Sequence, residues 1–213
     1  MPMPIIRYAS DNEVIAMLER YQCPTPFHQV RTLFLGCLAS PVESDWQGEI
    51  FEYVWKGTPP EFEFSKDEDE STEMILIGFW NRLADHQDEH NPFHLMRLDV
   101  KPTRASIQHL TQVRLQELDG FFRGLFGYED ALDLPESASD ALDTLTEIES
   151  ILVAMLPLLK DLGKPASPAS MKELVSKCEQ LTIIADVRIN QVVLACQEAR
   201  IHSKASSEPR TLH

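Results

Sequence analysis

The stretch TRASIQHLTQVRLQELDGFFRGLFG, residues 103–127, decides the fold class of this chain. Thr103 with Ser106 is a helix start signal, and Gly127 suits the position just after a helix end. Between them, apolar residues recur every three or four positions, as on one face of an α-helix. These residues are Ile107, Leu110, Val113, Leu115, Leu118, Phe121, Phe122 and Leu125. The segment therefore predicts one long helix.

The same spacing extends over most of the chain and predicts an all-α fold, a single multi-helix bundle of about seven helices. No alternating strand of convincing length occurs, and the residues around Val100 come nearest to one. Besides 103–127, the expected helices cover about 10–21, 26–38, 41–57, 71–83, 137–159 and 171–202. Pro157 should kink its helix or mark the last turn.

Proline-rich breaks near 24–26, 59–60, 92–102 and 163–168 separate these helices. Residues 58–70 are expected to be a loop, because Pro59-Pro60 cannot continue a helix and 67–70 is a solvated acidic run. Ser71 should then cap the next helix. Residues 85–102 should form a loop or short turns.

The domain prediction is one helical domain, residues 1–202, with a disordered tail at 203–213. A linker at 163–170 precedes a long C-terminal helix, 171–202, which carries a heptad-like apolar stripe interrupted by Arg188. We expect this helix to pack on its own bundle, with pairing in a homodimer as the alternative. The stripe comprises Met171, Leu174, Cys178, Leu181, Ala185, Val192 and Ala199.

Gly120 and Gly124 lie inside the helix predicted at 103–127. Each mid-helix glycine costs about 1 kcal/mol relative to alanine, so another helix should approach closely there. A small cleft that admits a partner side chain is the alternative. Gly36 and Gly78 suggest the same close packing.

Composition excludes several partners. The 213 residues carry a formal net charge of -15, which repels phosphate backbones and anionic lipid, so we expect no direct nucleic-acid or membrane binding. No segment reaches the ~18 apolar residues of a membrane span. Without a secretory signal at the N-terminus, the four cysteines at 23, 37, 178 and 196 suggest a cytoplasmic protein with reduced thiols.

The sharpest chemical motif is His86-Gln87-Asp88-Glu89-His90, which matches the H-x-x-E-H zinc signature, with His94 four residues further on. On one helix, His86 and His90 could share a zinc ion, with Glu89 as base. Pro92 leaves little room for that helix. We therefore interpret 86–94 as an exposed acidic loop and keep a metal-dependent hydrolase as the alternative function.

Other catalytic patterns are absent from the sequence. It contains no Glu-x-x-His pair for a di-metal bundle, no phosphate-binding glycine motif and no G-x-S-x-G. Cys23 and His28 are the only close pair of a nucleophile and a base, and they lack an orienting acid. We therefore assign no catalytic, cofactor-binding or metal-binding residue.

Two stretches resemble the signature helices of the YgfB/YecA-like bacterial proteins. They are TLFLGCLASPVESDW (Thr32–Trp46) and ELDGFFRGLFG (Glu117–Gly127). Two departures are Phe34-Leu35-Gly36, where the family usually has His-Gly, and Leu118-Asp119 in place of Trp-Cys. The chain also lacks the cysteine-rich C-terminal extension, so zinc binding is not carried over. The resemblance implies a small cytosolic bacterial α-helical protein without an assigned enzyme class.

These observations favour a non-enzymatic protein that binds another protein, as an interaction module or regulatory adaptor. Its acidic surface and the apolar loop residues Phe62, Phe64 and Phe93, expected to be exposed, suit such a contact. A third hypothesis is indirect gene regulation through a basic regulatory partner, whose cationic surface would complement the charge of -15.

Overall fold

The computed structural model describes residues 8–41, 50, 52–57, 66–160 and 167–207. These residues contain no strand, and the predicted all-α bundle with a long C-terminal helix is confirmed. The elements are α1 (Asp11–Arg20), α2 (Phe27–Ala39), α4 (Lys66–Ala84), the 3-10 turn η1 (Asp85–Gln87), α5 (Arg104–Phe126), α6 (Glu136–Lys160) and α7 (Pro168–Ser207).

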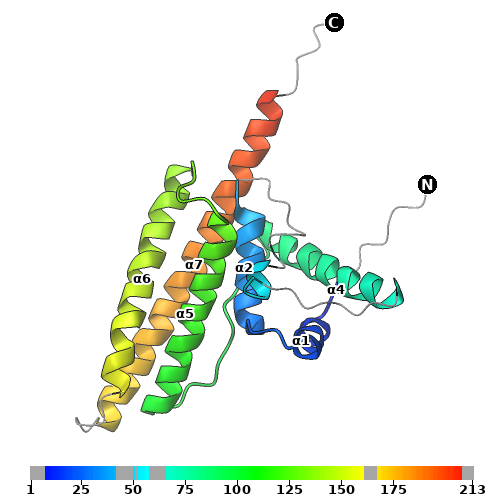
Figure 1. Ribbon diagram of the computed structural model, residues 1–213. Helices are drawn as coiled ribbons and strands as arrows, with labels where there is room; N and C mark the ends of the chain where they lie inside the picture. The colour runs from blue at the N-terminus through cyan, green and yellow to red at the C-terminus, as the bar shows by residue number, and fades with distance from the viewer. Residues whose placement is uncertain (1–7, 42–49, 51, 58–65, 161–166, 208–213) are drawn as a thin grey trace, which may run out of the picture.

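Four helices form the body of the molecule. Figure 1 shows α6, α7 and α5 running side by side, with α2 against them and α1 and α4 to one side. The C-terminal end of α7 projects beyond its neighbours. The expectation that the C-terminal helix packs on its own bundle agrees with this arrangement, since α7 contacts α6, α2 and α5.

Glycines bring α2 and α5 into backbone contact. A Cβ placed on Gly124 would lie 2.0 Å from the carbonyl oxygen of Leu33. A Cβ on Gly36 would lie 2.3 Å from the carbonyl oxygen of Phe121. Side chains larger than hydrogen do not fit at such distances, so the predicted close helix approach is confirmed.

Aromatic and branched side chains from all the main helices fill the core. Phe34 of α2 lies against Phe79 of α4, with ring centroids 5.1 Å apart. Phe121 of α5, Leu145 of α6 and Ile189 of α7 are fully buried in the same cluster. Burial of this apolar surface is the main stabilising contribution to the fold.

The helix ends follow the expected capping chemistry. Ser10 and Glu13 form the capping box of α1. The Thr103 hydroxyl accepts a hydrogen bond from the Ser106 amide, and Gly127 follows α5 with a φ of 57°. Pro157 lies in the last turn of α6, one of the two predicted outcomes.

Three predicted boundaries were wrong. Helix α4 begins at Lys66 rather than Ser71, because acidic residues such as 67–70 are favourable at a positive helix N-terminus. Helix α7 begins at Pro168 rather than Met171, where the Ser167 hydroxyl accepts from the Ser170 amide at 3.1 Å. It ends at Ser207, so residues 203–207 extend the helix, since adding residues to an existing helix costs little.

Some predictions fall outside the described residues. They concern most of the helix expected at 41–57, the loop residues 58–65 with Phe62 and Phe64, the linker at 163–166 and the tail at 208–213. Of the helix at 41–57, residues 50 and 52–54 are described and are helical.

Candidate protein-docking groove

A segment without regular secondary structure, Phe93–Met96, is held by side chains of α7; we call it the clasped segment. The Asn190 amide accepts from the Phe93 amide at 2.7 Å and donates to the Phe93 carbonyl at 2.9 Å. The Asp186 carboxylate accepts from the Leu95 amide at 3.0 Å. These side chains satisfy the backbone as a neighbouring strand would.

Helix α5 holds the other end of the clasped segment. Glu117 accepts from the Met96 amide at 2.7 Å, and Arg114 donates to the Met96 carbonyl at 2.6 Å. Arg114 and Glu117 also form a buried ion pair, and Arg114 donates to the Thr182 hydroxyl of α7 at 3.0 Å. Burial raises the pKa of the Glu117 carboxyl, while Arg114 opposes that shift. The pair therefore fixes both the segment and the position of α7.

Phe93 anchors the clasped segment, and its predicted exposure was wrong. The side chain is fully buried. It meets the His86 ring edge-on at a centroid distance of 5.4 Å, and the Arg31 guanidinium lies 4.9 Å from its ring centre. The physical reason is that the hydrogen bonds from Asn190 orient the Phe93 backbone so that its ring enters the core.

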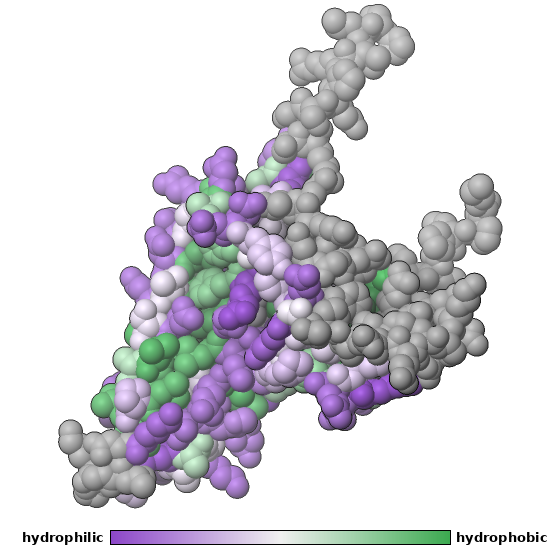
Figure 2. All heavy atoms as spheres, in the orientation of Figure 1, coloured by the Kyte–Doolittle hydropathy of each residue, from purple (hydrophilic) through white to green (hydrophobic). Residues whose placement is uncertain are grey.

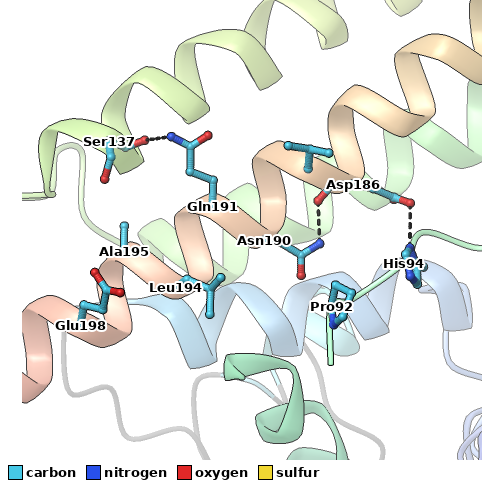
Figure 3. Close-up of a pocket in the computed structure, with 10 residues that line it drawn as sticks. Pro92, His94, Ser137, Asp186, Asn190, Gln191, Leu194, Ala195 and Glu198 are labelled. Atoms are coloured by element: carbon cyan, nitrogen blue, oxygen red, sulfur yellow. Dashed lines mark hydrogen bonds and ion pairs between the residues drawn. The ribbon is translucent and has the colours of Figure 1, made fainter. Parts of the chain in front are cut away.

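A groove runs along the outer face of α7, next to the clasped segment. Its cavity volume is about 600 Å³, and it extends from Asp186 to Glu198. Figure 3 shows Ser137, from the start of α6, on one side of α7, with Pro92 and His94 on the other. Gln191 donates to the Ser137 carbonyl at 2.9 Å, which fixes the first side. We call this hollow the docking groove.

The lining of the docking groove combines apolar side chains with carboxylates. Val187, Leu194 and Ala195 supply apolar surface. Asp186 and Glu198 supply the carboxylates, and no lysine or arginine occurs among the described residues that line the groove. His94 Nδ1 lies 3.1 Å from Asp186 Oδ2. The groove is therefore apolar along its length, with Glu198 at one end and Asp186, already paired with Leu95 and His94, at the other.

The docking groove lies on an apolar stripe that the sequence analysis missed. Ile183, Val187, Leu194 and Ile201 share one side of α7, because steps of four and seven residues return to the same face. We call them the outer stripe. Ile183, Val187 and Ile201 are 62%, 58% and 59% exposed.

The outer stripe lies opposite the stripe that faces the core. The core-facing residues of α7 are Cys178, Ala185, Ile189, Val192, Val193 and Cys196. Arg188, which was expected to interrupt the heptad-like stripe of the C-terminal helix, is partly buried and donates to Gln191 at 2.7 Å. The four- and seven-residue spacing of the outer stripe was visible in the sequence and could have predicted a second apolar face on α7.

Further exposed apolar side chains lie on α6. Figure 2 shows apolar side chains gathered on the face where α6 lies. Ile151, Val153 and Leu158 of α6 are 46%, 53% and 72% exposed. These residues provide a matched reference for the outer stripe, because they are similar in chemistry and belong to another helix.

The helix that would align His86 and His90 does not form. His86 lies in η1, where its Nδ1 is 2.9 Å from the Asn91 carbonyl. His90 and Glu89 lie in an exposed turn, 3.5 Å apart, and His94 is paired with Asp186. Within the described part of the chain, no three His, Cys, Asp or Glu side chains are grouped to hold a metal ion. The hydrolase alternative thus has no metal-binding arrangement among those residues.

The cysteines form no disulfide, and three of their thiols are harder to ionise than a free thiol. Burial raises the pKa of the Cys23, Cys178 and Cys196 thiols. Cys23 donates to the Val54 carbonyl at 3.3 Å, whereas His28 Nε2 is 2.8 Å from Gln116 Oε1. The structure therefore does not join Cys23 and His28 as a nucleophile and its base.

Comparison with known proteins provides no relative. No family model, curated protein or solved structure matches the chain. Among the described residues, no helix combines the length and apolar character needed to cross a bilayer. Functional inference therefore depends on the geometry of the docking groove.

Proposed function

We propose that this chain is a non-enzymatic protein-binding module that receives its partner in the docking groove. The observation that carries the proposal is the outer stripe, in which Ile183, Val187 and Ile201 are exposed on the side of α7 that faces away from the core. Exposing Ile183 and Val187 to water has a free-energy cost that a partner would remove. Contiguous exposed apolar residues with a polar rim are typical of protein interaction sites.

The walls of the groove favour docking because they are fixed before a partner arrives. Asn190 and Asp186 hold the clasped segment on one side, and Gln191 holds the start of α6 on the other. A preformed site loses less conformational entropy on binding. This rigidity suits an adaptor that presents one face to another protein.

We further propose that α2 and α5 are the signature helix pair of a divergent YgfB/YecA-like protein of the bacterial cytoplasm. The support is the packing of Gly36 against Gly124, which joins the two resembling stretches in space.

A purified protein that retains one zinc per chain would contradict the non-enzymatic proposal if a His90→Ala substitution abolished both zinc binding and hydrolysis.

Site-specific photocrosslinking in living cells tests the binding role. A benzophenone amino acid replaces Val187 in one variant and Leu158 of α6 in the control. We expect adducts with another protein from position 187, reproducible in mass and lost when Leu194→Ser is added. Equal adducts from both positions, or none from position 187, would contradict the proposal.

A further inference from the structure

We propose that the occupant of the docking groove is a basic amphipathic α-helix of a partner protein; this inference rests on the function proposed above. The geometry of the stripe is the first argument. From Ile183 to Ile201 the outer stripe covers 18 residue steps, about 27 Å along the axis of α7. A straight apolar strip of this length matches the apolar face of a helix of about five turns.

The shape of the groove is the second argument. Its two sides stand on either flank of α7, with Ser137 on one and Pro92 and His94 on the other. A helix lying along α7 would have one of these sides on each flank and would cover Val187 and Leu194. Apolar side chains at i, i+4 and i+7 of that helix would meet the outer stripe.

Charge defines the chemistry of the occupant. Glu198 lies at one end of the groove and Asp186, which also pairs with His94, at the other, and the described residues that line it include no lysine or arginine. The chain as a whole carries -15. Lysine or arginine beside the apolar residues of the occupant would therefore meet complementary charge and speed association.

The same charges argue against a second copy of this chain as the occupant. If two α7 helices paired through their outer stripes, Asp186 and Glu198 of both copies would enter one interface. Like charges placed together at an interface disfavour binding. A cationic partner avoids this repulsion, whereas a second copy introduces it.

Two synthetic helical peptides, which have the same leucine positions and differ only in the charge of the flanking residues, test the inference directly. Each has about 20 residues with leucine at i, i+4 and i+7; the flanking positions are lysine in one peptide and glutamate in the other. Fluorescence anisotropy against the full chain measures their affinities at low and high salt. We expect the lysine peptide to bind more tightly, with an affinity that falls as salt rises.

Substitutions in the chain identify the surface used. Val187→Ser with Leu194→Ser should weaken binding of the lysine peptide by roughly ten-fold or more, because apolar burial is lost. Glu198→Lys should weaken it by roughly five-fold. Leu158→Ser and Glu147→Lys, both on α6, are the matched controls and should change it by less than roughly two-fold.

Each contrary outcome overturns a definite part of the proposal. Equal binding of both peptides would refute the basic chemistry, and equal loss in the α6 controls would indicate general attraction to an acidic surface. Dimerisation that depends on Val187 in light scattering would make a second copy the occupant. If neither peptide binds while position 187 still crosslinks to another protein, the basic helix is refuted and the proposed function remains.

Discussion

The α2–α5 contact and the outer face of α7 use apolar helix surface in opposite ways. At the first, Gly36, Gly120 and Gly124 bring backbone against backbone and leave no space for a side chain. At the second, Ile183 and Val187 stand exposed beside an open groove. The first surface is already satisfied within the fold. The second is also apolar but has no packing neighbour among the described residues, so a partner can add stability there.

The clasped segment separates these two regions and depends on both. Arg114 and Glu117 of α5 bind its Met96 end, while Asn190 and Asp186 of α7 bind its Phe93 end. Hydrogen bonds from polar side chains thus hold this segment in place, whereas apolar packing holds the helices together. Because its backbone groups lie close to the core, losing one of these partners leaves a donor or acceptor unsatisfied.

The largest effect should come from Gly124→Ala. Its Cβ would lie 2.0 Å from the Leu33 carbonyl oxygen, so α2 and α5 must separate. We expect the free energy of unfolding to fall by about 3 kcal/mol, despite the helix-propensity gain of about 1 kcal/mol. Urea denaturation measures this change. Gln112→Ala, at an exposed position of α5, should alter it by less than about 0.5 kcal/mol. A stabilised Gly124→Ala protein would show that the two helices are not in tight contact.

The second effect concerns Asn190. Asn190→Ala removes the side chain that pairs with both the amide and the carbonyl of Phe93. We expect a loss of about 2 kcal/mol in the free energy of unfolding, because two partly buried backbone groups lose their partner. Hydrogen exchange at the amides of the clasped segment should also accelerate.

Gln191→Ala is the matched control for Asn190→Ala. Gln191 is the next residue of α7, and its amide donates to the Ser137 carbonyl in an exposed contact. Its loss should cost less than about 1 kcal/mol and leave exchange in the clasped segment unchanged. Equal effects of the two substitutions would mean that Asn190 has no special role in holding Phe93.

The helices were predictable because their signals are local. Thr103, Gly127 and the apolar spacing between them define α5 within one stretch of sequence. The burial of Phe93 was not predictable in this way, because Asn190, which orients its backbone, is 97 residues away. The groove was missed for another reason. The core-facing stripe of α7 is sufficient to explain how this helix packs on the bundle. The second apolar stripe was therefore not needed to predict the fold and went unnoticed.

The smallest effect should be a pH dependence at the edge of the α2–α5 contact. His28 of α2 pairs with Gln116 of α5 at 2.8 Å, and burial lowers the pKa of its imidazole from 6.5. A histidine with a lowered folded-state pKa contributes stability that is present above about pH 6.5 and is lost as the pH falls through the folded value.

We therefore expect the native chain to lose more stability between about pH 7.5 and 5.5 than a His28→Gln variant, by less than either substitution above. Urea denaturation at both pH values measures the difference, with His90→Gln as the exposed control. The native chain and His28→Gln share the same carboxylates, whose contributions largely cancel when the two are compared. Parallel pH profiles for the native chain and His28→Gln would show that this end of the α2–α5 contact is open to water, unlike the glycine-packed centre.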